Sequence, residues 1–511
     1  MKKFSLLVLL AFISILLACN SSKKITDTNN GSEEKKVLLH LPLEERLAIA
    51  KKYDRVEYFN DGLLLVKLNG KYGFIGKNGK EVTPCKYDNV EDFSEDLAKV
   101  YHNGKWGFID KNGKQVIPCI YDETNRFCEG LASVVINDKY GFINKSGKQV
   151  IPCKYDCAEN FSEGLARVEL NGKYGLIDKN GNEVAPCKYD DVEDFSEGMA
   201  LVIIGEWETG IRGFIDKSGK EVIPCKYEGA DVFSEGLAAV RLNGKCGFID
   251  KSGKLVVPYK YDTALEFHKG LACVELNGKY GFIDKSGNEV IPCKYDWAHY
   301  FSDGLIKVHI NGKWGIIDKS GNEVIPCIYD NIDSFSEGLA PVLIGDPKTG
   351  KWGFIDKSNN EVIPCKYDDV WSFRDGLARV ELNGKHGLID KDGKLVVPCK
   401  YYCIYDFCEE MAIVMIGDRK TGKYGFIDKS GKLVIPCTYD YVSNFEDGLV
   451  AVKLNDKWGF VDKNGKSITP VEYDGIKHIV PLGIIKAFGE NENGNFTIHY
   501  YDTTGKYLGS D

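Results

Sequence analysis

The sequence predicts an all-β fold in which tandem units of three short strands stack as an open superhelix. An aromatic residue followed by glycine recurs along the chain, 34 residues apart except at three intervals of 38. Most copies are followed by a Pro-Cys step and then a Tyr-Asp step at fixed spacing. One such unit is too small to bury a core, so neighbouring units must stack. The aromatic-Gly steps are Tyr72-Gly73, Trp106-Gly107, Tyr140-Gly141, Tyr174-Gly175, Tyr280-Gly281, Trp314-Gly315, Trp352-Gly353, Tyr424-Gly425 and Trp458-Gly459, and three further units carry Arg212, Cys246 or His386 before the glycine.

The segment from Asn103 to Asp122 shows how one unit is built. Asn103-Gly104 supplies two residues that tolerate positive φ, as a type I′ hairpin turn requires. Residues 106–110 then form one strand, residues 111–114 a second tight turn, and residues 115–119 a returning strand. Because Pro118 lacks an amide donor, the returning strand should end there or run at a sheet edge.

Two arrangements of these units compete. Closed β-propellers typically have about 4–8 blades of four strands, each roughly 40–45 residues long. Twelve three-stranded units exceed one such ring, and no linker interrupts the spacing near Gly281, where two rings would divide. The prediction is therefore an open solenoid, with one or more β-propeller-like rings as the alternative.

The repeated motif resembles the WG-repeat family, the WG-containing β repeats found widely in bacterial proteins. The resemblance covers about residues 53–470, where a dozen copies agree in phase. It implies a β-repeat fold and brings no catalytic residues with it. From Val471 onward the Tyr-Asp step persists but the aromatic-Gly and Pro-Cys steps are lost. This end is expected to be a degenerate thirteenth unit that caps the array.

The N-terminal residues have the features of an export signal. Lys2-Lys3 is followed by an apolar run to Leu17 that is too short for a stable membrane span. The run ends in Leu-Ala-Cys, which resembles the lipobox of bacterial lipoproteins and implies cleavage before Cys19 and lipidation of that residue. Asn20, rather than aspartate, follows Cys19, which favours the outer membrane under the usual sorting rule. An ordinary signal peptide with a chance cysteine is the alternative.

The sequence therefore divides into five segments with different expected roles. They are a lipoprotein signal peptide at 1–18, a flexible polar tether at 19–40, a short helical cap at 41–52, the repeat array at 53–470 and the degenerate capping repeat at 471–511.

Composition and motifs argue against several functions. With 66 basic and 75 acidic residues the net charge is −9, which disfavours a nucleic-acid partner. No nucleophile elbow, P-loop or metalloprotease motif occurs, so the chain is not expected to be an enzyme. The 17 cysteines include no CxxC pair, and no metal or cofactor is expected. A column of cysteines follows the repeated proline, and burial as free thiols is favoured over a disulfide framework.

Variable positions in an otherwise constant unit are where repeat proteins usually bind ligands. The residues after Tyr-Asp are mostly polar in the early units and become aromatic in the later ones. Exposed aromatic rings there would form a platform for a sugar or a peptide, whereas the alternative is that they fill gaps between units. The candidate ligand-binding residues are Trp297, His299, Tyr300, Trp371, Tyr405 and Tyr441.

These observations lead to one functional hypothesis and two alternatives. The hypothesis is a cell-envelope protein, anchored in the membrane through Cys19, whose array is a binding or scaffolding surface for a protein or glycan. The near-identity of the units suggests instead a purely structural spacer or assembly protein. An envelope enzyme is the third possibility, and only the size of the chain supports it.

Overall fold

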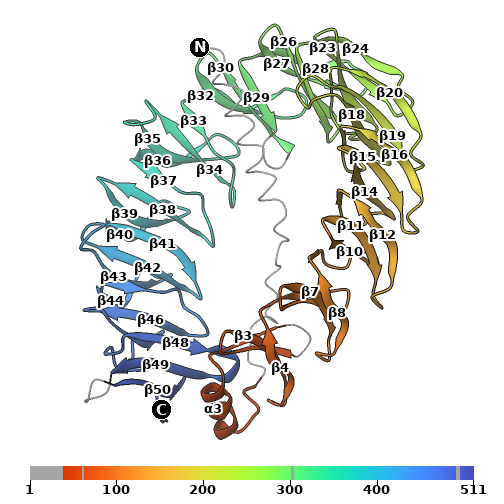
Figure 1. The fold of residues 1–511 in the computed structure, drawn as a ribbon. Helices are drawn as coiled ribbons and strands as arrows, with labels where there is room; N and C mark the ends of the chain where they lie inside the picture. Colours follow the sequence, from red (N-terminus) through yellow and green to blue (C-terminus); the bar gives the residue numbers. More distant parts are fainter. Residues whose placement is uncertain (1–37, 60–62, 301–303, 491–494) are drawn as a thin grey trace. The chain divides into compact units, whose positions relative to one another are not determined.

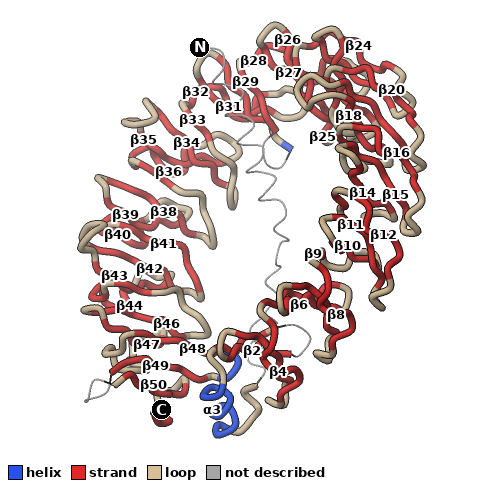
Figure 2. Tube along the Cα trace, in the orientation of Figure 1, coloured by secondary structure: helices blue, strands red, loops and turns tan. Residues whose placement is uncertain are grey.

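The computed structural model describes residues 38–59, 63–300, 304–490 and 495–511. Within them the chain is all-β apart from the helix α3 (Leu43–Lys52) and the short 3-10 helix η2 (Val480–Leu482), as Figure 2 shows. The described strands form thirteen separate sheets. These sheets belong to two compact units: the segment up to Cys85 joins Ile476–Asp511, and Lys86–Gly475 forms the other.

The sheet closest to the expected unit contains β5 (Asn89–Ser94), β6 (Leu97–His102), β7 (Lys105–Asp110) and β8 (Gln115–Tyr121) in that order. The prediction of three strands per unit was wrong by one. The residues after Tyr-Asp pair with the following strand, Val90 opposite Val100, and so begin a four-stranded antiparallel sheet. In most sheets this first strand has only two residues, which is why no sequence alternation reveals it.

Hairpin turns follow the sequence closely. Asn103 and Gly104 have φ of 51° and 81°, which confirms the predicted type I′ turn. Glu129 and Gly130, with φ of 51° and 86°, form a second turn of this kind. Pro118 does not end its strand: β8 continues to Tyr121 as the edge strand of the sheet, where a missing amide donor is tolerated.

The same order of strands recurs through the larger unit (Figure 1). The next two sheets contain β9 (Glu123–Thr124), β10 (Leu131–Ile136), β11 (Lys139–Asn144) and β12 (Gln149–Tyr155), and then β13 (Cys157–Ala158), β14 (Leu165–Leu170), β15 (Lys173–Asp178) and β16 (Glu183–Tyr189). Two more contain β17 (Asp191–Val192), β18 (Met199–Ile204), β19 (Ile211–Asp216) and β20 (Glu221–Tyr227), and then β21 (Gly229–Ala230), β22 (Leu237–Leu242), β23 (Lys245–Asp250) and β24 (Leu255–Tyr261). The fifth contains β25 (Thr263–His268), β26 (Leu271–Leu276), β27 (Lys279–Asp284) and β28 (Glu289–Tyr295).

The remaining sheets of this unit carry the candidate ligand-binding residues. They are β29 (Trp297–Tyr300), β30 (Ile306–Ile310), β31 (Lys313–Ile317) and β32 (Glu323–Tyr329); β33 (Asn331–Ile332), β34 (Leu339–Ile344), β35 (Lys351–Asp356) and β36 (Glu361–Tyr367); β37 (Asp369–Val370), β38 (Leu377–Leu382), β39 (Lys385–Asp390) and β40 (Leu395–Tyr401); β41 (Cys403–Cys408), β42 (Met411–Ile416), β43 (Lys423–Asp428) and β44 (Leu433–Tyr439); and the three-stranded β45 (Tyr441–Val442), β46 (Leu449–Leu454) and β47 (Lys457–Asp462).

The hydrophobic core lies between successive sheets rather than within any one of them. Phe108 and Tyr121 of one sheet pack in a single buried cluster with Phe127 and Val134 of the next. The rings of Phe108 and Phe127 meet edge to face at 4.9 Å. Equivalent clusters recur along the larger unit, so each sheet is stable only through its neighbours.

Two repeated carboxylates fasten most sheets to the next. Asp122, from the Tyr-Asp step, pairs with Lys105 of the preceding hairpin and accepts a hydrogen bond from the backbone amide of Asn137 in the following one. Glu95 accepts a hydrogen bond from the amide of Gly130 at 2.9 Å and pairs with Lys145 at 3.3 Å, both in the next sheet. These contacts explain why Tyr-Asp and Asn-Gly-Lys recur in nearly every unit.

The smaller unit brings together the first and last sheets of the chain. The first contains β1 (Arg55–Tyr58), β2 (Leu63–Leu68), β3 (Lys71–Gly76) and β4 (Glu81–Tyr87), and the last contains β48 (Gly475–Ile479), β49 (Ile484–Glu490), β50 (Phe496–Asp502) and β51 (Tyr507–Ser510). Leu64 and Val66 lie in one buried cluster with Ile484 and Tyr500. The residues expected to form a degenerate unit therefore make a complete four-stranded sheet.

Polar contacts reinforce this junction of the chain ends. Arg46 of α3 donates a hydrogen bond to the Leu482 carbonyl at 2.6 Å. Lys486, only 4 % exposed, donates to the Tyr53 carbonyl at 2.9 Å. An open superhelix or solenoid does not account for a core shared by its first and last sheets. The structure matches the β-propeller-like alternative instead.

Candidate functional site

The residues proposed from the sequence as a ligand-binding face lie on, or directly after, the first strand of four sheets. Trp297, His299 and Tyr300 lie on β29, Trp371 follows β37, Tyr405 lies on β41 and Tyr441 lies on β45. Because this first strand is short and lies at a sheet edge, its side chains are free to vary without loss of ladder hydrogen bonds.

Trp297 and His299 form an exposed aromatic pair on β29. Their rings stack with centroids 5.4 Å apart and an angle of 16° between the planes. Trp297 is 38 % exposed and also meets the edge of Trp314 at 5.3 Å. The pair therefore offers a small aromatic surface of the kind expected from the sequence.

Tyr300 has a different environment from the other candidates. Its hydroxyl donates a hydrogen bond to the Leu271 carbonyl at 2.6 Å, and its ring meets the edge of Phe282 at 5.3 Å. Burial raises the pKa of this hydroxyl well above its usual range. These contacts place Tyr300 against the core between two sheets, as the alternative interpretation of the aromatic residues expected.

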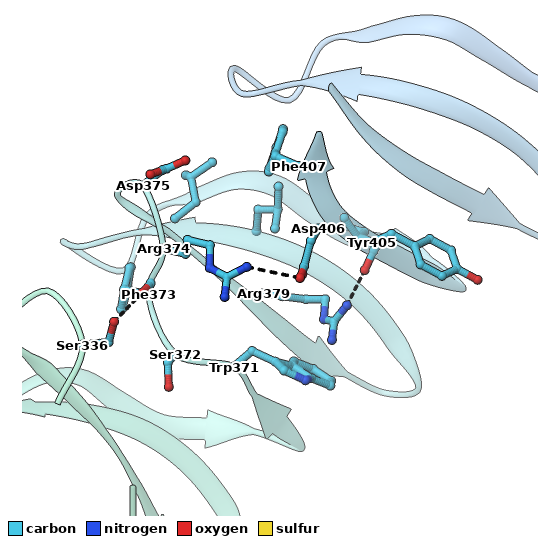
Figure 3. A pocket seen from close by; sticks show the side chains of 13 residues that line it. Ser336, Trp371, Ser372, Phe373, Arg374, Asp375, Arg379, Tyr405, Asp406 and Phe407 are labelled. Atoms are coloured by element: carbon cyan, nitrogen blue, oxygen red, sulfur yellow. Dashed lines mark hydrogen bonds and ion pairs between the residues drawn. The ribbon is translucent and has the colours of Figure 1, made fainter. Parts of the chain in front are cut away.

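Trp371 and Tyr405 line one cavity, of about 360 Å³. Figure 3 shows Trp371 beside the guanidinium of Arg379, with Tyr405 at the edge. Tyr405 is 46 % exposed, and burial, with Cys403 and Tyr424 nearby, raises the pKa of its hydroxyl. The full lining is Ser336, Trp371, Ser372, Phe373, Arg374, Asp375, Leu377, Arg379, Leu388, Ile404, Tyr405, Asp406 and Phe407.

The cavity exists because one core phenylalanine is missing. In the preceding pair of sheets Phe354 packs against Phe373 with ring centroids 5.0 Å apart, and Phe373 is only 2 % exposed. One unit later Leu388 replaces that first phenylalanine, and its partner Phe407 is only partly buried. The smaller side chain leaves space between the sheets, into which polar residues project.

The same substitution occurs once more, at Leu176, and it has the same result. A cavity of about 270 Å³ opens there between β14 and β17, against a partly buried Phe195. Its lining occupies positions equivalent to those of the first cavity, but with different chemistry: Glu159 stands in the place of Trp371, and Glu193 in the place of Tyr405. We call the two spaces the Trp371 cavity and the Glu159 cavity.

Sequence reasoning missed the arginines of the Trp371 cavity. Arg379 places its guanidinium 3.8 Å from the centre of the Trp371 ring, a cation–π contact. Arg374 pairs with Asp406 at 3.4 Å, but both side chains are 80 % exposed, so this pair adds little stability. The signal that could have identified the cavity is the loss of the repeated phenylalanine, which leucine replaces at residues 176 and 388 and isoleucine at residue 316.

Tyr441 is not among the residues that line the Trp371 cavity or the Glu159 cavity. It is 51 % exposed and meets the edge of Trp458 at 5.6 Å. The six candidates therefore have four different environments: Trp297 and His299 form an exposed pair, Tyr300 packs against the core, Trp371 and Tyr405 line a cavity, and Tyr441 is an exposed ring outside both cavities.

The cysteine column consists of thiols that face the core between sheets. The sixteen cysteines of the described residues are all unpaired. Cys365 is typical: its thiol lies 3.8 Å from the Val342 carbonyl, and burial raises its pKa to about 11. No group of three or more potential metal ligands occurs in the part of the chain that the structure describes.

Cys19, the expected lipidation site, lies outside the described residues. In the described part of the chain, no helix has the length and apolar character needed to cross a membrane.

The fold and its cavities define a class of protein: a tandem β-repeat protein whose successive four-stranded sheets share their cores. The sequence model of the WG containing repeat matches thirteen consecutive segments that run from residue 44 to residue 480. The chain belongs to this family, which agrees with the resemblance found in the sequence. No curated protein matches it.

Several solved structures are similar over long stretches but at low identity. A eukaryotic initiation factor shares 13 % identity over 62 % of this chain and 96 % of its own, with a TM-score of 0.26. The extracellular domain of a putative hybrid two-component system from B. thetaiotaomicron shares 9 % identity over 88 % of this chain and 74 % of its own, with a TM-score of 0.20. The extracellular domain of a putative one-component system from B. thetaiotaomicron shares 8 % identity over 90 % of this chain and 76 % of its own, with a TM-score of 0.19.

Proposed function

We propose that this protein is a lipid-anchored binding module of the bacterial cell envelope, and that the Trp371 cavity is its ligand site. The observation that carries the proposal is the cavity itself. Its volume of about 360 Å³ lies within the range of small-molecule sites, and two of its aromatic residues, Trp371 and Tyr405, stand where the equivalent cavity has glutamates. The ligand is a glycan or a protein side chain, which the cavity binds without catalysing a reaction.

The arrangement of constant and variable residues supports a binding role. The constant residues, such as Asp122 and Glu95, fasten one sheet to the next. Four residues that line the Trp371 cavity vary from unit to unit and are not part of those fastenings: Trp371, Arg374, Arg379 and Tyr405. Asp375, also in the lining, occupies the position of Glu95 and pairs with Lys429. A structural spacer is the alternative function, because near-identical units are all that a spacer needs.

Filling the cavity distinguishes the two functions. Leu388→Phe restores the side chain that stands at this position in the neighbouring unit as Phe354, where it packs against a buried ring. We expect this variant to keep or raise the melting temperature and to lose at least about tenfold in affinity for envelope material, about 1.4 kcal/mol. Trp371→Ala should weaken binding as well.

The matched control is Leu176→Phe, which fills the Glu159 cavity by the same substitution and should leave binding unchanged. Binding is measured as retention of purified protein on envelope fractions, and stability as thermal unfolding of the same samples. Unchanged retention in both Leu388→Phe and Trp371→Ala would favour the spacer.

The anchor is tested separately at Cys19. Cys19→Ser removes the sulfur that would carry the lipid, so the protein should leave the membrane fraction and appear as soluble or unprocessed material. A single acyl chain binds membranes only weakly, whereas two or more anchor stably. If the variant still fractionates with membranes after a carbonate wash, the lipoprotein assignment is wrong.

A further inference from the structure

Two arginines in this chain occupy equivalent positions within the same local sequence, Leu-Ala-Arg-Val-Glu-Leu. They are Arg167 on β14 and Arg379 on β38. Each projects into the space left by a leucine that replaces phenylalanine, and each donates a hydrogen bond to the backbone of the next sheet, at Val192 or Ile404. The two sites therefore share a backbone frame, and they differ in the side chains around the guanidinium.

Arg167 is neutralised by the protein itself. Its guanidinium pairs with the carboxylate of Glu159 and, at 3.0 Å, with that of Asp191. One acid comes from its own sheet and the other from the next, so the guanidinium is held between two sheets. In the Glu159 cavity the positive charge of Arg167 is therefore balanced by carboxylates of the protein itself.

Arg379 has lost both of these partners. Trp371 stands in the place of Glu159, and Cys403 stands in the place of Asp191. Among the described residues no carboxylate lies within ion-pair distance of Arg379. The Nε atoms of both arginines are buried without a hydrogen-bond acceptor, so the two sites differ in the carboxylates that Arg167 has and Arg379 lacks. A partly buried guanidinium without a carboxylate partner is favoured by a ligand that supplies one.

The other charged groups of the cavity do not replace the lost partners. Asp406 pairs with Arg374 at 3.4 Å, and Asp375 pairs with Lys429 at 3.3 Å. Trp371 holds the guanidinium of Arg379 in place through its ring face, which attracts a cation without neutralising it. One positive charge therefore remains uncompensated in the wall of the cavity.

We propose that the Trp371 cavity binds a carboxylate-bearing sugar, a uronic acid in a glycan chain, whose carboxylate completes the coordination of Arg379. The inference rests on the proposed function, because it requires this cavity to be the ligand site. A planar guanidinium matches a carboxylate in shape and charge. The ligand supplies what Glu159 and Asp191 supply to Arg167.

The remaining wall favours a sugar over an acidic peptide. Asp375 and Asp406 are hydrogen-bond acceptors that sugar hydroxyls can satisfy, whereas they repel further acidic side chains. Tyr405, 46 % exposed at the edge of the cavity, offers a ring face against which a sugar ring can pack. Binding of an acidic peptide in place of the sugar is therefore the competing result in the following experiment.

The test is calorimetric titration of the full-length protein with trigalacturonate, with a neutral galactose trisaccharide and with an acidic peptide, triglutamate. We expect trigalacturonate to bind at least about tenfold more tightly than the neutral sugar, because only the acidic sugar has a carboxylate that can pair with the guanidinium of Arg379. Arg379→Gln should remove this preference, whereas Arg167→Gln should not, because that arginine is already neutralised by the protein.

A charge-filling variant avoids the ambiguity of a misfolded protein. Trp371→Glu combined with Cys403→Asp gives Arg379 the two acids that Arg167 has on the same backbone, so the fold should be retained. This variant should lose binding of trigalacturonate. The reciprocal change, Glu159→Trp with Asp191→Cys and Glu193→Tyr, should raise the stoichiometry from one site to two.

The outcomes separate this inference from the proposed function. Equal binding of both sugars, or full binding by Arg379→Gln, overturns the carboxylate inference. Binding of an acidic peptide but of neither sugar, with retention on envelope still lost in Leu388→Phe, also overturns it and leaves the binding function standing. Retention that does not depend on Leu388 overturns the proposed function as well.

Discussion

Gly107→Ala is expected to destabilise the sheet β5–β8 by about 3 kcal/mol. A Cβ at this glycine would lie 2.6 Å from the Ile117 carbonyl oxygen and 2.7 Å from the Cys119 amide nitrogen, both backbone atoms of the neighbouring strand. No side-chain rotation relieves such a contact, so the strands must move apart. The register of β7 against β8 shifts on either side of Phe108, and the backbone of β8 approaches Gly107 closely there.

Gly104→Ala is the matched control in the same hairpin. Gly104 has φ of 81° and no atom within 4 Å of an added Cβ, so only backbone strain of about 1 kcal/mol is expected. Hydrogen exchange at the amides of β6–β8 measures the local free energy of opening in both variants. Equal effects of the two substitutions would show that the close approach at Gly107 relaxes easily.

Tyr500→Ala is expected to destabilise the smaller unit by about 3–5 kcal/mol and to loosen both ends of the chain together. Tyr500 is 1 % exposed, and it belongs to the buried cluster that contains Leu64 and Val66 from the first sheet. Its hydroxyl also donates a hydrogen bond to Asp511 at 2.7 Å. Removal of the ring should therefore lower protection in α3, β2 and β3, which precede it by more than four hundred residues of sequence.

Tyr507→Ala, on β51 of the same sheet, is the control. Tyr507 is 50 % exposed, so its loss should change the free energy of unfolding by about 1 kcal/mol or less. Hydrogen exchange with peptide resolution and limited proteolysis read out both variants. If Tyr500→Ala loosens only residues 476–511 and leaves α3–β3 protected, the two sheets do not fold as one unit.

The sequence predicts what is decided locally. Asn103-Gly104 determines its turn because only a few residue types accept positive φ. The β7 and β8 strands follow from residues that favour strands between two turn signals. The first strand of most sheets escapes prediction because two residues, such as Glu123 and Thr124, carry no alternation. It forms because the Glu129-Gly130 turn returns the chain against it.

Contacts between distant residues could not be predicted in this way. Ile484 and Tyr500 lie beyond the last recognisable repeat, and nothing in their local pattern specifies Leu64 as a partner. The preference for an open array followed from counting three strands per unit and from the usual number of propeller blades. Both premises fail once the short first strand and the shared terminal core are seen.

The candidate site was partly predictable. Trp371 and Tyr405 stood out as aromatic residues at positions that are polar elsewhere, and both line the cavity. Tyr300 was selected by the same pattern but lies against the core, because its hydroxyl finds the Leu271 carbonyl. Arg379 was missed because an arginine in the same sequence, Arg167, makes it look like an ordinary repeat residue. Its difference lies in neighbours from another strand.

The fastening of each sheet to the next bears on how such a gene can change in length. Glu95 reaches Gly130 and Lys145, and its counterpart Glu129 reaches Gly164 and Lys179, always one sheet ahead. Loss or duplication of one whole repeat by recombination therefore rejoins a glutamate to an equivalent glycine and lysine. The crossover point within the repeat matters little, because nearly every copy supplies the same set; one exception is Lys269, which stands in the place of the glutamate. A deletion that removes the glutamate but keeps its glycine and lysine breaks the fastening at the junction and should be removed by selection. The intervals of 38 residues keep the fastening: across one of them Glu163 still pairs with Lys217 at 2.8 Å.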